Sequence, residues 1–356
     1  MELQELRGEG FRNLSVFSLN PGSGINVIYG DNGAGKTSVL EAVYFLARAK
    51  SFRAPRSEKV IQRGAPRCWV FGRGERGSVA HRFGVQREPG RTRVRLNGED
   101  VRSLSEWAAF WPVEVINSEA QRFVVDGPAV RRSFLNWGVF HVEHQYGYHW
   151  QRFRRALQQC NGALRSGDPR LAASWEGPVA DAAEALDRGR EAFSARLEQA
   201  VVGYFARWLP EHDVSIRYRR GWRRDGSLLE LFRQSRDQAI RMGHLLQGPQ
   251  RADLQLLSGG EEAQHRLSRG QQKVAVMALT LAKAQLIAEA SGTEPILLVD
   301  DLPAELDEVR RKDVLGALEQ VDAQVFVTCI EPQTIVGLDG TPTWFHVEHG
   351  RLATMV

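Results

Sequence analysis

The chain has 356 residues, of which 42% are hydrophobic and 25% charged, a composition typical of globular proteins with a sizeable core. Its amino terminus lacks the basic-then-apolar pattern of a signal peptide, and the apolar run at residues 275–279 is too short to cross a bilayer. Three cysteines lie far apart without a C-x-x-C pair, which disfavours a metal site or a disulfide framework. We therefore expect a cytoplasmic protein of one large or two modest domains, with no membrane segment.

Residues 30–37 match the G-x-x-x-x-G-K-[ST] phosphate-binding loop. An apolar, β-branched run at 25–29 predicts a strand before the loop, and apolar residues at helical spacing predict a helix after it. Glycines let backbone N–H groups surround a phosphate, and the helix N-terminus adds partial positive charge. Lys36 is expected to reach the β- and γ-phosphates of ATP, and the Thr37 hydroxyl to hold Mg²⁺. The predicted ATP-binding residues are Gly30, Asp31, Asn32, Gly33, Ala34, Gly35, Lys36 and Thr37. The alternative is a glycine-rich turn that binds nothing.

Positive charge is concentrated in one part of the chain. Residues 48–95 contain 14 lysines and arginines against three acids, a balance of +11 in a chain of net charge +4, so the remainder carries −7. Strand-like runs at 68–72, 78–85 and 92–96 would carry the arginines as a stripe on an antiparallel sheet, and Asn-Gly at 97–98 predicts a tight turn. Such a stripe suits a polyanion, with nucleic acid the first candidate, and a solvated arginine-rich surface is an equal alternative.

A second basic segment, residues 217–224, interleaves arginines with Tyr218 and Trp222 in a strand-like run. It is able to contact phosphates and stack on bases, and a solvated sheet edge is the alternative. The candidate DNA-binding residues in the two segments are Arg91, Arg93, Arg95, Arg219 and Arg220.

The pattern between about residues 127 and 209 is helical, with a break at 162–169 and a long helix predicted from 178 to 208. These segments are too short and irregular for a sustained heptad arm. They favour two or three helices packed antiparallel.

Four apolar residues at 296–299 followed by Asp300 and Asp301 predict a buried parallel-type strand that ends in two carboxylates. Ligands bind at the carboxyl ends of such strands. We expect Asp300 to hold Mg²⁺ together with Thr37, and Asp301 to orient or deprotonate the attacking water. Lys36, Asp300 and Asp301 are therefore the predicted catalytic residues.

Leu-Ser-Arg-Gly-Gln-Gln-Lys at residues 267–273 opens an amphipathic helix and offers a second anion-binding N-terminus. Two such segments far apart in the sequence indicate the ABC-type arrangement, in which the signature segment of one subunit closes on ATP bound by another. The residues predicted to act in trans are Ser268, Arg269, Gly270 and Gln271. A plain helix cap by Ser268 is the alternative.

Together these motifs resemble the RecF family, bacterial recombinational-repair ATPases related to SMC proteins, essentially end to end. The segments that carry the resemblance are residues 30–37 with 40–42, Val-Arg-Arg-Ser-Phe-Leu at 130–135, Gly-Pro-Gln-Arg-Ala-Asp-Leu at 248–254, the signature at 267–273, and Leu-Val-Asp-Asp-Leu at 298–302 with Glu-Leu-Asp at 305–307. The chain departs from the family pattern at Gln250, where His is usual, and at Ala304, where Ser is common. Residues 117–120 fit the family's Ser-Pro-Glu-Asp-like stretch loosely, so they assign no γ-phosphate sensor.

The resemblance implies an α/β fold: an ABC-type P-loop ATPase head built from both chain ends, with an inserted helical lobe and no long coiled-coil arm. The expected ranges are 1–127 for the N-terminal half of the head, 128–250 for the helical lobe and 251–356 for the C-terminal half. The implied cofactors are ATP and Mg²⁺. The implied assembly is an ATP-dependent homodimer that binds duplex and gapped DNA with little sequence preference. Slow, DNA-stimulated hydrolysis would release it, and RecO and RecR would be its partners in loading RecA.

An ATPase subunit of an ABC transporter shares both anion-binding segments and is the alternative function. Transporter subunits, however, place the signature much closer to the phosphate loop and usually carry a switch histidine after the acidic strand. This chain has Thr328 in that place, and its insertion is helical and basic. A nucleotide kinase is a third possible function, but such an enzyme would not need the signature segment at residues 267–273.

Overall fold

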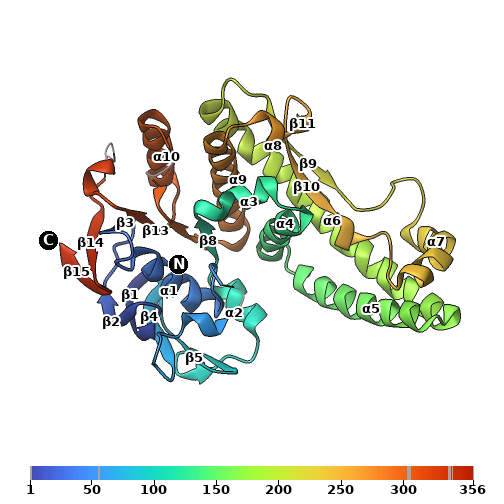
Figure 1. Ribbon diagram of the computed structural model, residues 1–356, viewed down its shortest axis with the longest axis horizontal. Helices are drawn as coiled ribbons and strands as arrows, with labels where there is room; N and C mark the ends of the chain where they lie inside the picture. The colour runs from blue at the N-terminus through green and yellow to red at the C-terminus, as the bar shows by residue number, and fades with distance from the viewer. Residues whose placement is uncertain (1, 55–56, 303–305, 336–337, 339, 356) are drawn as a thin grey trace. The chain divides into compact units, whose positions relative to one another are not determined.

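The chain folds into two compact units in the computed structural model, which describes residues 2–54, 57–302, 306–335, 338 and 340–355 (Figure 1). The first unit combines Met1–Ala120 with Ile287–Val356, and the second is Gln121–Leu286. Both ends of the chain therefore build the first unit. This division confirms the expected α/β head with an inserted, mostly helical unit.

The compact units divide the chain differently from the predicted ranges 1–127, 128–250 and 251–356. Residues 251–286 belong to the second unit because strand β10 (Asp253–Ser258) pairs along its length with β9 (Val214–Arg219). The second unit also begins earlier than predicted, since it includes helix α3 (Arg122–Val125). The signature segment thus lies in the inserted unit, while the phosphate loop and Asp300 lie in the first.

A six-stranded, mainly parallel sheet forms one layer of the first unit, in the order β15-β14-β3-β13-β12-β8. Its strands are β3 (Ile25–Tyr29), β8 (Val113–Ile116), β12 (Ile296–Val299), β13 (Val325–Cys329), β14 (Thr343–Glu348) and β15 (Arg351–Met355), the last antiparallel to β14. The central strands β12 and β13 are buried throughout, as expected for parallel strands covered on both faces. The order places β13 between the strand before the phosphate loop and the strand before Asp300.

An antiparallel sheet in the order β2-β1-β4-β5-β6-β7 forms a second layer and confirms the predicted strands of the basic region. Its strands are β1 (Glu2–Phe11), β2 (Leu14–Leu19), β4 (Cys68–Arg76), β5 (Val79–Glu88), β6 (Arg91–Leu96) and β7 (Glu99–Asp100). The turn after β6 has Asn97 at φ 52° and Gly98 at φ 92°, which is the left-handed geometry that Asn-Gly predicts. One face of this sheet is apolar and buried, and the other carries the polar side chains.

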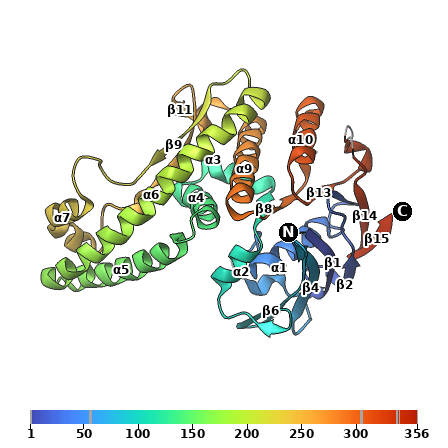
Figure 2. The same cartoon turned by 180° about the vertical axis from the view of Figure 1, so that it is seen from behind.

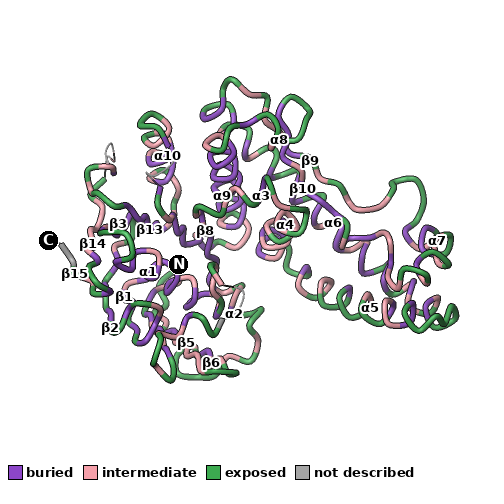
Figure 3. Tube along the Cα trace, in the orientation of Figure 1, coloured by how far each residue is buried: buried purple, intermediate pink, exposed green. Residues whose placement is uncertain are grey.

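The apolar core of the first unit lies around helix α1 (Lys36–Arg48), most of which is buried (Figure 3). Helix α2 (Leu104–Phe110) adds Trp107 to this core, where the rings of Trp107 and Trp111 both contact Phe83. Helix α2 was not predicted from the sequence, because seven residues span too few turns to show a helical period. Helix α10 (Glu308–Gln320) completes the unit.

The second unit is built on helices α4 (Pro128–Val142), α5 (Tyr146–Ser166), α6 (Pro169–Trp208) and α7 (Leu228–Met242). Helices α5 and α6 lie side by side in both views, joined by only Gly167 and Asp168, so they pack antiparallel as predicted (Figures 1 and 2). A small sheet in the order β11-β10-β9 completes the unit, with β11 at Glu261–Glu262. The short α8 (Ala263–Arg266) and α9 (Arg269–Ser291) follow it. The described residues of the insertion thus form this helical pair and not a long coiled-coil arm.

Helix α6 begins nine residues earlier than the start predicted at residue 178. Asp168 caps it by accepting hydrogen bonds from the backbone N–H groups of Arg170 (2.9 Å) and Leu171 (3.1 Å), and Pro169 occupies its first turn, where proline is tolerated. The prediction was wrong because it read Pro178 as a helix start. In the structure Pro178 lies within the helix.

Helix α9 is long and apolar enough to cross a membrane by length and composition alone, with a mean hydropathy of 1.4 over its most apolar window. The apolar segment is therefore longer than the run at 275–279 that the sequence analysis considered. In the structure 72% of that window is buried inside the protein, as in the core helix of a folded domain.

Gln324 joins the two sheets of the first unit. Its buried side-chain amide accepts a hydrogen bond from Leu3 N–H (2.8 Å) and donates to Leu3 O (2.8 Å) and Gly22 O (2.7 Å). Leu3 lies in β1 of the antiparallel sheet, and Gln324 directly precedes β13 of the parallel sheet. One side chain therefore satisfies three backbone groups between the layers.

We predict that Gln324→Ala lowers the free energy of unfolding by about 3 kcal/mol, because buried backbone groups lose their partners. Urea unfolding followed by far-UV circular dichroism measures the change. Gln320→Ala, at an exposed position in α10, is the matched control and should change stability little. Equal unfolding midpoints for the two variants would contradict the role assigned to Gln324.

Candidate functional site

The phosphate loop connects β3 to α1, and two of its glycines are required by the backbone. Gly30 has φ 148° and Gly35 has φ 124°, values that other residues rarely adopt. A Cβ atom at Gly30 would also lie 2.2 Å from the carbonyl oxygen of Val347 in β14. No side chain caps α1 at Gly35, so the first backbone N–H groups of the helix are available to an anion.

Lys36 lies over the loop from the first turn of α1. Its ammonium group donates to the carbonyl oxygens of Gly30 (2.7 Å) and Asp31 (3.0 Å), and the residue is only 8% exposed. The side chain is thus held at the same loop whose N–H groups would receive phosphates. A polyphosphate bound at these N–H groups would therefore lie near this positive charge.

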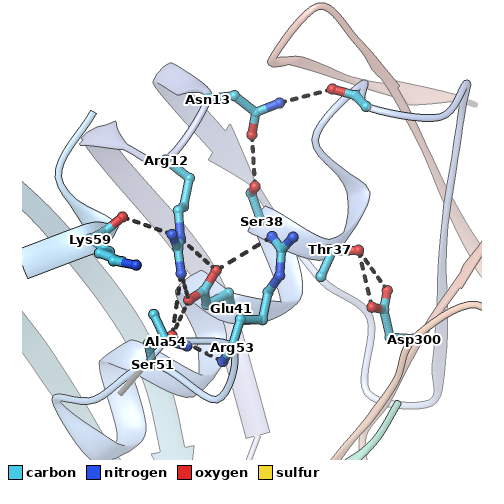
Figure 4. A network of polar contacts seen from close by, with 11 residues as sticks. Arg12, Asn13, Thr37, Ser38, Glu41, Ser51, Arg53, Ala54, Lys59 and Asp300 are labelled. Atoms are coloured by element: carbon cyan, nitrogen blue, oxygen red, sulfur yellow. Dashed lines mark hydrogen bonds and ion pairs between the residues drawn. The ribbon is translucent and has the colours of Figure 1, made fainter. Parts of the chain in front are cut away.

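Thr37 and Asp300 meet at the carboxyl ends of the parallel strands (Figure 4). The Thr37 hydroxyl lies 2.9 and 3.0 Å from the two carboxylate oxygens of Asp300. Thr328, at the end of the intervening strand β13, donates from its hydroxyl to Asp300 Oδ1 at 2.8 Å. Burial raises the pKa of Asp300, and the hydrogen bonds from Thr328 and Thr37 counteract that effect. Two oxygen groups that suit Mg²⁺ therefore lie side by side.

Asp301 follows with an exposed side chain and φ 55°, a left-handed conformation that aspartate tolerates better than most residues. Its backbone N–H donates to the Thr328 hydroxyl at 2.7 Å. Thr328 consequently contacts both acidic residues, and it is fully buried. The predicted residues Lys36, Thr37, Asp300 and Asp301 are thus brought together in the first unit.

A cavity of about 850 Å³ opens at these residues, within the size range of small-molecule sites. Its lining includes Asn32, Gly33, Gly35, Lys36, Thr37, Asp300 and Asp301 from the predicted site. It also includes residues to which no function was assigned from the sequence, namely Arg12, Asn13, Ser38, Phe52, Arg53, Lys59, Ile61, Asn117, Ser118, Glu119 and Thr328. Asn117, Ser118 and Glu119 belong to the stretch that fitted the family pattern loosely. The structure therefore places that stretch at the cavity.

Arg12, which is partly exposed, forms an ion pair with the buried Glu41 beside the loop (Figure 4). The Arg12 guanidinium donates to both Glu41 carboxylate oxygens, at 2.8 and 2.6 Å, and to the carbonyl oxygen of Lys59 at 2.7 Å. Glu41 is fully buried in α1, and a buried carboxylate needs such a partner. An acidic residue within the apolar stretch of α1 is a sequence signal from which a nearby cation could have been predicted, although no such prediction was made.

Asn13 attaches the turn between β1 and β2 to both sides of the phosphate loop (Figure 4). Its amide donates to Gly33 O at 3.0 Å and accepts from the Ser38 hydroxyl at 2.7 Å. Arg12, the neighbouring turn residue, has φ 56°. This turn therefore holds the loop in place through side chains from a different sheet.

The signature segment lies in the second unit, at the start of α9. The Ser268 hydroxyl accepts from Gln271 N–H at 3.3 Å, and the Gln271 side chain accepts from Ser268 N–H at 2.8 Å, so the pair forms a capping box. The capping alternative is thus present in the structure. Ser268 and Arg269 are exposed and Gly270 is half-buried, and their action in trans stays a prediction.

The predicted DNA-binding arginines differ in their surroundings. Arg91, Arg93 and Arg95 lie on β6, where Arg95 forms an ion pair with exposed Asp100 at 3.0 Å and lowers the pKa of that carboxyl. Arg219 is exposed at the end of β9. Arg220 contacts buried Asp187 at 2.7 Å and lies over the Trp222 ring, so its charge is shared within the protein. The expected family positions Ala304 and Glu305 lie outside the described residues.

Comparisons with known proteins agree on one family. The family model for the RecF/RecN/SMC N terminal domain matches residues 2–352. The DNA replication and repair protein RecF of Pseudomonas aeruginosa (strain LESB58) is 40% identical over 360 residues, covering 99% of this chain and 98% of that protein. The RecF of Chromohalobacter salexigens is also 40% identical, covering 99% of this chain and all of that protein.

A solved structure of "the recombination mediator protein RecF-ATP in RecFOR pathway" has the same fold. It superposes with a TM-score of 0.88 at 21% identity, covering 100% of this chain and 98% of that chain. The family model and the 40% identical, full-length relatives identify the RecF family and not the transporter subunits considered from the sequence. The chain belongs to the RecF family, within the wider RecF/RecN/SMC group.

Proposed function

We propose that this protein is an ATP-switched, DNA-binding ATPase of DNA replication and recombinational repair. The observation that carries the proposal is the contact between the Thr37 hydroxyl and the Asp300 carboxylate at the phosphate loop. The printed names of the relatives, a DNA replication and repair protein and a recombination mediator bound to ATP, supply the biological setting.

Each residue of the cavity has a distinct part in ATP binding and hydrolysis. Lys36 and the N–H groups of α1 bind the phosphates, while Thr37 and Asp300 hold Mg²⁺. The described residues contain no group of three or more His, Cys, Asp or Glu arranged for a metal, so this ion depends on the nucleotide as well. Bound Mg²⁺ neutralises charge on the phosphates. Asp301 orients the attacking water or accepts its proton.

ATP acts in this proposal as a bridge between two copies of the chain. The phosphates neutralise Lys36 in one copy, and Ser268 with the Gly270 N–H of the other copy completes the binding site. The exposed N-terminus of α9 is available for this contact. Asp301 is one methylene shorter than the glutamate of fast ABC ATPases, so water is held farther from the carboxylate. Slow turnover then suits a switch that releases the dimer.

The DNA-bound dimer is proposed to help RecO and RecR load RecA at gaps. Support comes from the RecFOR pathway named for the solved relative and from the arginines on β6. Sedimentation velocity with and without ATP and duplex DNA tests dimerisation, nucleotide dependence and partner class together. A monomer under all conditions, with no DNA bound, would rule the proposal out.

We predict that Lys36→Ala abolishes ATP-dependent dimerisation, because the phosphates lose their charged partner. Sedimentation with ATP measures the loss. Lys59→Ala removes a charge from the same cavity without touching the loop and is the control. A Lys36→Ala protein that still dimerises with ATP would refute the bridging role of the nucleotide.

We predict that Thr328→Val lowers the rate of ATP hydrolysis and moves the acid limb of its pH profile to higher pH. The Thr328 hydroxyl lowers the pKa of Asp300, so its loss favours the protonated carboxyl, which binds a cation poorly. Thr328→Ser keeps the hydroxyl and should retain the wild-type limb. An unchanged limb in Thr328→Val would show that Asp300 is not the group that limits the reaction at acid pH.

We predict that the triple change of Arg91, Arg93 and Arg95 to Glu weakens duplex binding and flattens its salt dependence, because phosphate contacts release counterions. ATP binding should persist, since β6 contributes no residue to the cavity at the loop. The control is the same triple reversal at exposed Arg154, Arg155 and Arg170 of the second unit. Equal losses in the two triples would indicate a net-charge effect and remove β6 from the interface.

A further inference from the structure

The outer face of the antiparallel sheet, opposite its buried side, carries aromatic and arginine side chains in aligned rows. In one row Arg7, Phe71, Gly84 and Arg95 lie directly opposite one another across β1, β4, β5 and β6. In the neighbouring row Glu9, Trp69, Gln86 and Arg93 do the same. Directly opposed residues share a face, and Arg82 lies two residues before Gly84 on the same face of β5. These nine side-chain positions form one surface, which we call the aromatic-arginine face.

A cavity of about 520 Å³ lies on this face, and Gly84 forms its floor. A Cβ atom added at Gly84 would meet no atom within 4 Å, so open space stands above the backbone there. Gly84 lies in a regular stretch of β5 and is not among the residues with positive φ, so its backbone does not require glycine. Because Gly84 lies directly opposite Phe71 and has no side chain, nothing from β5 covers the ring of Phe71 at this position.

The lining is rich in arginine, and two of its arginines, Arg93 and Arg95, also contact the carboxylate of Asp100 at 3.9 and 3.0 Å. Arg7, Arg82, Arg93 and Arg95 contribute to the lining, and no acidic residue does. The Trp69 indole N–H donates to Glu9 at 3.1 Å, which fixes the orientation of that ring. Arg82 and Arg95 are exposed, while Trp69 and Phe71 are partly exposed. Flat rings beside several guanidinium groups, over a floor without a side chain, match a surface for stacked bases with adjacent phosphates.

We propose that the aromatic-arginine face binds unpaired nucleotides of a nucleic acid strand, with a base over Gly84 against Phe71 and phosphates on Arg82, Arg93 and Arg95. The inference rests on the proposed DNA-binding function and goes beyond it. In a duplex the bases are stacked on one another, and its phosphates alone would need neither the rings nor the open floor. Gln86 and Asn97 add amide groups to the lining, which are able to hydrogen-bond base edges.

The test fills the cavity without removing any contact. Gly84→Leu places a leucine side chain in the open space above Gly84. Ala80→Leu is the matched control, because it places a leucine on the same face of β5 outside the lining of the cavity. Phe71→Leu keeps an apolar side chain and removes the ring. Fluorescence anisotropy at one salt concentration measures affinity for labelled oligothymidylate, for an abasic strand of equal length and for a blunt duplex.

Stacking predicts about a tenfold loss of affinity for oligothymidylate in Gly84→Leu and in Phe71→Leu. Ala80→Leu should bind like the wild type, and all variants should bind the abasic strand and the duplex within about twofold of it. Loss on all three probes alike would overturn the proposal in favour of simple phosphate binding. Unchanged binding of oligothymidylate would overturn it as well.

A polyglutamate competitor and a comparison of nucleotide with DNA binding complete the test. If polyglutamate displaces oligothymidylate as effectively as the abasic strand displaces it, the face binds acidic proteins, and the proposal is overturned. Wild-type protein that binds ATP but no DNA probe at all would instead refute the proposed function. Normal duplex binding with no effect of Gly84→Leu on oligothymidylate would refute this inference alone.

Discussion

The contact between the Thr37 hydroxyl and the Asp300 carboxylate joins residues 263 positions apart and depends on the order of three parallel strands. Strand β3 leads into the phosphate loop, β12 leads into Asp300, and β13 lies between them. All three end at one edge of the sheet, where α/β proteins bind ligands. The second unit is inserted in the sequence between β8 and β12, and these two strands pair side by side in the sheet.

The local parts of this site were readable from the sequence. The phosphate loop, its strand and its helix occupy one continuous segment, and the acidic strand ends in two adjacent carboxylates. Each pattern has a physical cause within a few residues, such as glycine conformations or an apolar run before a charge. We predicted that the phosphate loop and the acidic strand act together because an ATP site of this kind needs both. The structure brings Thr37 and Asp300 together.

The residues that support the site were missed because their signals are not local. The sequence placed Thr328 after the acidic strand, but its hydrogen bond to Asp300 could be foreseen only once β13 is known to lie between β3 and β12. Arg12 and Glu41 are 29 positions apart, and only folding brings the β1–β2 turn to helix α1. The start of α6 was misplaced for the opposite reason, since one local signal at Pro178 was given more weight than the capping residue Asp168. Strands β14 and β15 also went unpredicted, although β14 contacts Gly30 of the loop.

The turn carrying Arg12 and Asn13 has a thermodynamic consequence for the whole first unit. It belongs to β1 and β2, the same sheet that bears the basic strands, and it also hydrogen-bonds the phosphate loop. A ligand that shifts this turn from the basic sheet would also shift the phosphate loop, and a ligand at the loop would likewise shift the sheet. Allosteric linkage is reciprocal. If a bound nucleotide raises the affinity of the protein for a nucleic acid by some factor, the bound nucleic acid raises the affinity for the nucleotide by the same factor.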